Sequence, residues 1–134
     1  MANTKKTMLD DLVAQLETID RVTKSTRKLW PTDRTQNFTG YVGIVDGDEV
    51  NIVEDSTHIR WELECALVCQ RRGTDIQEMI DDIKDLIYGT LATDIGALQI
   101  NYVGNTAPVE LKDKLYEATT ISINIVYVSS KSGF

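Results

Sequence analysis

The stretch that decides the fold is His58-Ile-Arg-Trp-Glu-Leu-Glu-Cys-Ala-Leu-Val-Cys-Gln70. From residue 59 onward its side chains alternate between two sets. One set is Ile59, Trp61, Leu63, Cys65, Leu67 and Cys69, and the other is Arg60, Glu62, Glu64, Ala66, Val68 and Gln70. Successive side chains of a strand point to opposite faces, so the pattern predicts a β-strand with one buried face. We expect water or a partner on its polar face.

Two segments carry apolar side chains at helical spacing, residues 7–19 and 74–88. Each therefore presents one apolar stripe, as an amphipathic helix does. Thr7 is the expected N-cap of the first helix. In the second, Thr74 and Gln77 have the spacing of a capping box, and Gly89 is expected at the C′ position with a positive φ.

Further strands are expected at residues 22–30, 41–45, 50–53, 97–103 and 120–127. The first carries charge on both faces and stops at Pro31, which suits an edge strand or a projecting arm. Asp46-Gly47 predicts a tight hairpin turn, since glycine tolerates a positive φ. Residues 31–39 are expected to form a loop, and residues 109–116 fit either a helical turn or a strand.

The pattern as a whole predicts an α+β fold with the two helices packed on one face of a sheet. The expected core comprises Leu12, Leu16, Trp61, Leu63, Leu67, Ile80, Ile83, Leu86, Ile123 and Ile125. The length of 134 residues suggests a single domain, 1–134, with a flexible tail at about residues 129–134. The polar N-terminus and the absence of a long apolar run favour neither secretion nor membrane insertion.

Charge is unevenly distributed along the chain. The net charge of −7 argues against a protein that binds nucleic acid through phosphate contacts. Residues 1–37 hold seven basic and five acidic side chains (+2), and residues 38–134 hold seven and sixteen (−9). The basic segment can pair with its own acidic body or with a neighbouring copy, or it can remain solvated.

The sequence offers little catalytic or metal-binding chemistry. The single histidine, His58, is expected on the polar face of its strand, without a nucleophile beside it. Cys65 and Cys69 are about 13 Å apart if they lie on one strand, too far for a disulfide, and are expected to be reduced core thiols. Residues 46–49 lack the regularly spaced ligand positions and the distant bidentate glutamate of an EF-hand calcium loop. Asp81, Asp82 and Asp85 fit a solvated helix face better than a magnesium site. We therefore expect no catalytic residues, no metal and no cofactor.

Assembly contacts are expected instead between copies of the chain. Aromatic side chains near a loop can anchor an interface, although packing on their own domain is an equal alternative. In this hypothesis the basic residues between 21 and 34 meet an acidic surface on the next copy. The aromatic side chains of Trp30 and Phe38 provide the buried contact area. The candidate contact residues are Arg27, Lys28, Trp30, Arg34, Phe38, Asp46, Asp48 and Glu49.

The order of these segments resembles that of bacteriophage tail terminator proteins, also called tail completion or minor tail proteins. The likeness extends over about residues 8–128: an amphipathic helix, a strand and loop, Gly40-Tyr-Val-Gly-Ile-Val-Asp-Gly-Asp-Glu49, the long alternating strand, a second helix and a closing strand, Ile121-Ser-Ile-Asn-Ile-Val-Tyr127. It is a likeness of pattern, with no short motif that transfers a functional residue.

The resemblance implies a single mixed β-sheet with helices on one face and a non-enzymatic virion protein. Such proteins form a ring, expected here to hold six copies, on the head-proximal end of the tail tube. The partners implied are further copies of the chain, the tail tube protein and a head-completion or neck protein, with DNA only passing through the lumen. The implied location is the virion tail, after assembly in the host cytoplasm. Another phage head–tail connector, or a small acidic inhibitor, is the alternative.

Overall fold

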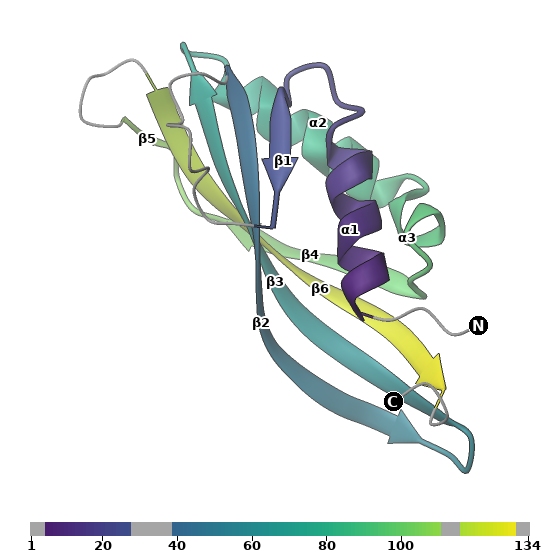
Figure 1. Cartoon of the computed structure of the whole chain (residues 1–134). Helices are drawn as coiled ribbons and strands as arrows, with labels where there is room; N and C mark the ends of the chain where they lie inside the picture. The colour runs from purple at the N-terminus through teal and green to yellow at the C-terminus, as the bar shows by residue number, and fades with distance from the viewer. Residues whose placement is uncertain (1–4, 28–38, 111–115, 131–134) are drawn as a thin grey trace.

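The computed structural model describes residues 5–27, 39–110 and 116–130. In this part of the chain one mixed sheet of six strands carries three helices on one face, which confirms the α+β prediction (Figure 1). The elements are α1 (Lys5–Leu16), β1 (Lys24–Thr26), β2 (Gly40–Glu54), β3 (His58–Arg72), α2 (Ile76–Tyr88), α3 (Leu91–Asp94), β4 (Gln99–Asn105), β5 (Val109–Glu110) and β6 (Tyr116–Ser130). The strand order is β1-β2-β3-β6-β4, and β5 pairs with β6. Among the described strand pairs, β1–β2 is parallel and the others are antiparallel.

The predicted alternating strand is β3, and it lies in the middle of the sheet. It pairs with β6 along its whole length, from His58 opposite Ser130 to Arg72 opposite Tyr116. Residues that face each other across a ladder share one face of the sheet, and Leu63 lies opposite Ile125. This face packs under the helices and forms the core. We call the opposite side of the sheet the open face.

The predicted hairpin at Asp46-Gly47 is wrong. Residues 40–54 form one continuous strand, β2, which pairs with β3 from Gly40 to Glu54. The register shifts between Asp46 and Glu49, so the extra residues form a bulge instead of a turn. The real hairpin connection is at residues 55–57, where the Asp55 N–H donates to the His58 carbonyl at 2.9 Å.

The N-terminal elements are shorter or shifted relative to the predictions. Within the described residues, α1 begins at Lys5, so Thr7 lies inside the helix and is not its N-cap. The strand predicted at 22–30 shrinks to the three residues of β1, beside Tyr41, Val42 and Gly43 of β2. Residues 28–30 of that segment and residues 31–38 of the predicted loop lie outside the described residues.

Helix α2 forms where the pattern predicts it, but its ends differ. It begins at Ile76, and no side chain caps it, so the capping box of Thr74 and Gln77 is wrong. The Gln77 amide instead donates to Asp81 on the next turn, at 3.0 Å. Gly89 has φ −87°, so the predicted left-handed conformation at the C-terminus is also wrong.

The C-terminal half differs from the predictions at four places. The segment after Gly89 contains the short helix α3, and β4 covers residues 99–105 instead of 97–103. The ambiguous region at 109–116 begins as β5 and ends in β6, while residues 111–115 lie outside the described part. Ser129 is 8% exposed and pairs with Ile59, so residues 129–130 belong to the sheet and not to a tail.

The core confirms most of the predicted positions. Eight of the ten predicted residues are buried, whereas Trp61 and Leu86 are partly buried and pack against the cluster. The Trp61 indole N–H donates to Ser129 Oγ at 2.9 Å, which explains why this ring stays near the rim of the core. Helix α1 adds Met8 and Leu9 to the core, both fully buried.

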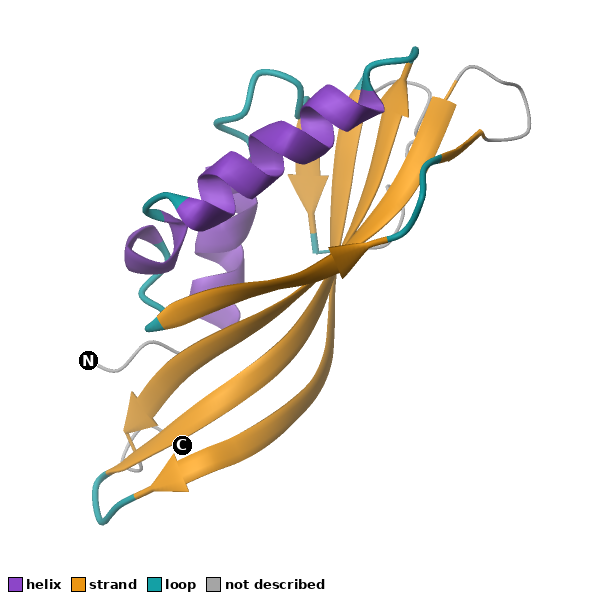
Figure 2. Ribbon diagram, turned by 180° about the vertical axis from the view of Figure 1, so that it is seen from behind, coloured by secondary structure: helices purple, strands orange, loops and turns teal. Residues whose placement is uncertain are grey.

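The three longest strands extend beyond the helix layer (Figures 1 and 2). Here β2 and β3 form a projecting hairpin, with the end of β6 beside them. Every residue from 50 to 58 is exposed, and we call these residues the arm. The structure thus shows a projection in the β2–β3 hairpin, whereas residues 28–30 of the segment predicted as an edge strand or arm lie outside the described part. None of the helices in the described ranges combines the length and apolarity that crossing a membrane requires.

Candidate functional site

His58 closes the turn of the arm. Its backbone N–H and that of Thr57 both donate to Asp55 Oδ1, at 2.7 and 2.8 Å. These two backbone donors hold the pKa of Asp55 below its usual value. The imidazole Nδ1 lies 2.8 Å from the Thr57 hydroxyl. The described contact of the ring is thus a hydroxyl–imidazole hydrogen bond within the exposed turn, where Thr57 Oγ1 also lies 3.2 Å from Asp55 Oδ1.

Cys65 and Cys69 lie in the core, as the strand pattern predicts. Both are buried and unbridged. Burial raises the pKa of each thiol to about 12, so neither forms a thiolate near neutral pH. Among residues 5–27, 39–110 and 116–130, no three His, Cys, Asp or Glu side chains gather as metal ligands would.

The bulge in β2 is held by two basic side chains from the N-terminal segment. Lys5 Nζ lies 2.8 Å from Asp46 Oδ2 and 3.6 Å from Glu49 Oε2. Arg27 reaches Asp46 Oδ1 at 3.5 Å and Asp10 at 3.9 Å. The ammonium of Lys5 lowers the pKa of Asp46, and Asp46 in turn raises that of Lys5. The acidic segment 46–49 therefore binds cationic side chains of its own chain.

A second charged cluster joins the segment after α1 to the start of α2. Arg71 forms two hydrogen bonds with the Asp75 carboxylate, at 3.0 and 3.2 Å, and donates a third to the Arg21 carbonyl at 2.7 Å. The Arg21 guanidinium lies 2.8 Å from Asp82 and 3.4 Å from Asp75. Arg71 lowers the pKa of Asp75, with a smaller contribution from Arg21. Basic and acidic segments thus meet within one chain.

The structure brings together only some of the predicted contact residues. Arg27, Asp46 and Glu49 form the cluster at the bulge, and Asp48 is exposed beside it. The other four candidates, Lys28, Trp30, Arg34 and Phe38, lie outside the described residues. The prediction that this segment contacts a neighbouring copy therefore stays a prediction.

The arm carries a surface that the sequence analysis missed. Val50, Ile52 and Val53 are 57%, 46% and 54% exposed. Exposed aliphatic side chains that lie next to one another can form a surface for another molecule. The three aliphatic residues are visible in the sequence. They were assigned to the second strand of a short hairpin, residues 50–53, and a strand that ends there does not project from the sheet.

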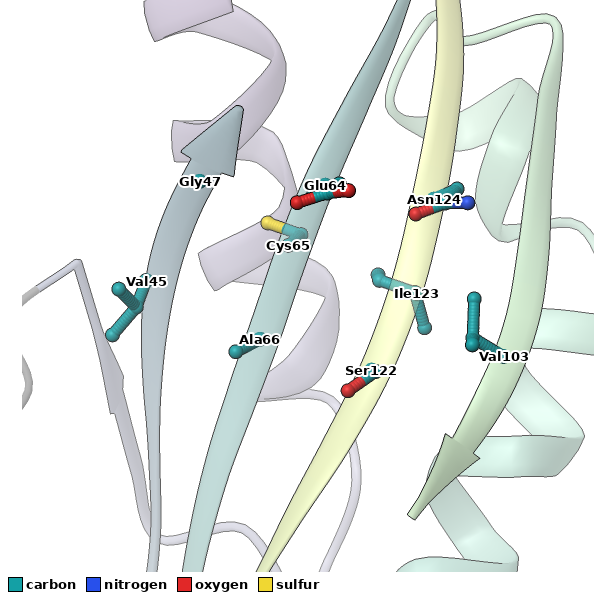
Figure 3. A pocket seen from close by; sticks show the side chains of 9 residues that line it. All are labelled: Val45, Gly47, Glu64, Cys65, Ala66, Val103, Ser122, Ile123 and Asn124. Carbon is teal, nitrogen blue, oxygen red and sulfur yellow. The ribbon is translucent and has the colours of Figure 1, made fainter. Parts of the chain in front are cut away.

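The open face holds a shallow hollow of about 400 Å³. In Figure 3 its floor comes from β3 and β6, and Val45 of β2 and Val103 of β4 stand on its two sides. Ala66 and Ser122 face each other across the ladder, and their small side chains leave the space. The lining residues are Val45, Gly47, Glu64, Cys65, Ala66, Val103, Ser122, Ile123 and Asn124. This lining combines two exposed valines with the polar side chains of Glu64, Ser122 and Asn124.

Comparison with known proteins adds no family to these observations. No family model matches the chain, and no curated protein matches its sequence.

Proposed function

We propose that this protein is a structural subunit of a bacteriophage tail. In this proposal six copies form a ring on the head-proximal end of the tail tube. The ring ends tube polymerisation and gives the head-completion or neck protein a surface to bind. The protein has no enzymatic activity in this role, it acts in the virion, and DNA only passes through the ring.

The observation that carries the proposal is the projecting arm with its three exposed aliphatic side chains. A sheet that extends beyond its own helices leaves apolar surface which another subunit can bury. The mixed sheet with helices on one face is the fold that the resemblance to tail terminators implies. The arm and this resemblance together favour an assembly role.

The charged clusters weigh against the alternative of a small acidic inhibitor. A protein that mimics nucleic acid needs an array of carboxylates free to meet a basic partner. Here Asp46, Asp75 and Asp82 are already paired with basic side chains of the same chain. Among the alternatives, another head–tail connector fits these features better than an inhibitor does.

The test is to remove the gene from the phage genome that encodes it and to measure tails by negative-stain electron microscopy. The proposal predicts tubes of uncontrolled length, because nothing caps them. Tubes of normal length beside full, unattached heads would instead indicate a neck or adaptor protein. Tails of normal length that join heads normally would refute both.

A matched complementation separates assembly from chemistry. Supplying the His58→Ala chain should restore tail length, because the hydrogen bonds described for His58 lie within the turn of the arm. A folded His58→Ala protein that fails to restore length would contradict the non-enzymatic role proposed for this residue.

A further inference from the structure

The sheet has two open edges within the described residues. On one side, β1 pairs with residues 41–43 of β2, and none of the described strands flanks the outer edge of β2 along the arm. On the other side, β4 is the last strand, and its ladder hydrogen bonds run only to β6. An open edge presents backbone donors and acceptors that another strand can pair with. We call residues 50–53 the arm edge and residues 99–105 the β4 edge.

Both edges carry the same local irregularity. A register shift between Asn51 and Val53 leaves Ile52 without a partner on β3, and one between Tyr102 and Gly104 does the same for Val103 on the β6 side. Ile52 is 46% exposed and Val103 is 61% exposed. A bulge usually protects an edge by disrupting its ladder. Here each bulge also exposes an aliphatic side chain, which provides apolar surface at both edges.

We propose that the arm edge of one copy packs along the β4 edge of the next copy, with Ile52 and Val103 in the contact. The two surfaces differ and lie at opposite edges of one sheet. A copy that binds a neighbour through its arm edge therefore keeps its β4 edge available for another copy. Such heterologous contacts repeat from copy to copy and close into a ring when the rotation allows. The inference rests on the proposed function for the ring, but the contact itself is tested separately.

Charge selects this pairing over pairing of two arms. Carboxylates flank the arm edge on both sides: the exposed Asp48 before it, and Glu54 and Asp55 after it. Two arms side by side would place these like charges opposite one another, which is destabilising. Residues 99–105 contain no charged side chain, so the β4 edge accepts the acidic arm without repulsion.

Cross-linking between two variants that each gain one surface cysteine tests the contact. Ile52→Cys and Val103→Cys proteins of different mass are mixed at high concentration and treated with a bismaleimide of about 8 Å reach, which tolerates a two-residue slip in register. The native Cys65 and Cys69 are buried thiols and remain unmodified in the folded protein. The control replaces Ile52→Cys with Ala14→Cys, on the exposed side of α1.

The expected product is a mixed dimer that contains one Ile52→Cys and one Val103→Cys chain, in at least tenfold excess over the control. Cross-links that join two copies of the same variant would show a symmetric contact and overturn the proposal. The absence of any product above the control would overturn it as well. The cross-linking results do not depend on tail length. The proposed contact can therefore be refuted while the proposed tail role stands, and the tail role can be refuted while the contact stands.

Opposite charges at one position give a second test that does not need cysteine. Val103→Asp should weaken self-association, measured by analytical ultracentrifugation, because it faces the acidic arm. Val103→Lys should retain or strengthen it at low salt. Equal loss in both folded variants would refute the charge argument and point to pairing of two β4 edges.

Discussion

Replacing Gly40 with alanine perturbs the close contact between the segment before β1 and the start of β2. A Cβ atom at this position would lie 1.8 Å from the Arg21 carbonyl oxygen. Ordinary contacts of a Cβ atom begin at 3.4 Å, so the two segments must separate by about 1.6 Å. The obstacle is backbone, which cannot rotate away as the end of a side chain can.

The expected loss follows from the hydrogen bonds across this contact. The Thr23 N–H donates to the Gly40 carbonyl at 2.8 Å, and the Gly40 N–H donates to Thr23 Oγ1 at 3.2 Å. The Arg71 guanidinium donates to the Arg21 carbonyl at 2.7 Å. Two neutral bonds at about 0.5–1.5 kcal/mol each and one charged bond at about 1.5–3 kcal/mol total roughly 2.5–6 kcal/mol. Alanine also lowers the conformational entropy of the unfolded chain, which stabilises the folded protein by about 0.4–1 kcal/mol. The free energy of unfolding should therefore fall by roughly 2–5 kcal/mol in total.

Gly104→Ala is the matched control, since it makes the same chemical change in another strand. A Cβ atom there meets no heavy atom within 4 Å, and the backbone φ is not in the left-handed region. We expect this variant to be about 0.4–1 kcal/mol more stable than the wild type. Urea denaturation followed by tryptophan fluorescence measures both. A Gly40→Ala protein as stable as Gly104→Ala would refute the close approach.

Three further predictions concern the core and the bulge. Ile83→Ala should reduce the free energy of unfolding by about 2–5 kcal/mol, because the side chain is fully buried; thermal melting unchanged from the wild type would place Ile83 outside the core. Asp46→Asn should destabilise the protein by up to about 1 kcal/mol at pH 7. The partner Lys5 lowers the pKa of Asp46, so this stabilisation is present above 3.8 and is lost as the pH falls through the lowered pKa; an equal effect at pH 2 and pH 7 would contradict the ion pair. A thiol reagent at pH 8 should modify Cys65 and Cys69 only after denaturation, and fast modification of the native protein would show that they are accessible.

The central elements could be predicted because their patterns are local. Alternation along residues 59–70 depends only on which side chains avoid water, and it located β3 correctly. The stripe that includes Ile80 and Ile83 identified α2 in the same way. Both elements have one buried face and one wet face, so the period of each is visible without knowledge of its neighbours.

The errors arose where distant residues override a local signal. Asp46-Gly47 has the composition of a hairpin turn, but Lys5 and Arg27 bind Asp46 from segments that are remote in sequence. A bulge absorbs the extra residues, and the strand continues. Thr74 likewise has the spacing of a cap, but the side chains at this end are organised around Asp75 by Arg71 and Arg21. Contacts between remote segments cannot be predicted from the periodicity of a short stretch of sequence. The open edges of the sheet depend on the order of its strands, which the sequence pattern does not give.

The central ladder has a consequence for the order in which the chain folds. The strands β2 and β3 are joined by three residues, so their hairpin can form as soon as both have been synthesised. The other neighbour of β3 is β6, and in their ladder His58 lies opposite Ser130. Strand β6 must therefore be synthesised before the core face can close. During this interval the nascent hairpin exposes both its future core side and the aliphatic residues of the arm. Contacts so distant in sequence form slowly, and exposed strands associate with one another. Recovery of soluble protein should therefore depend on how quickly synthesis reaches β6, and slower translation between residues 72 and 116 should favour aggregation.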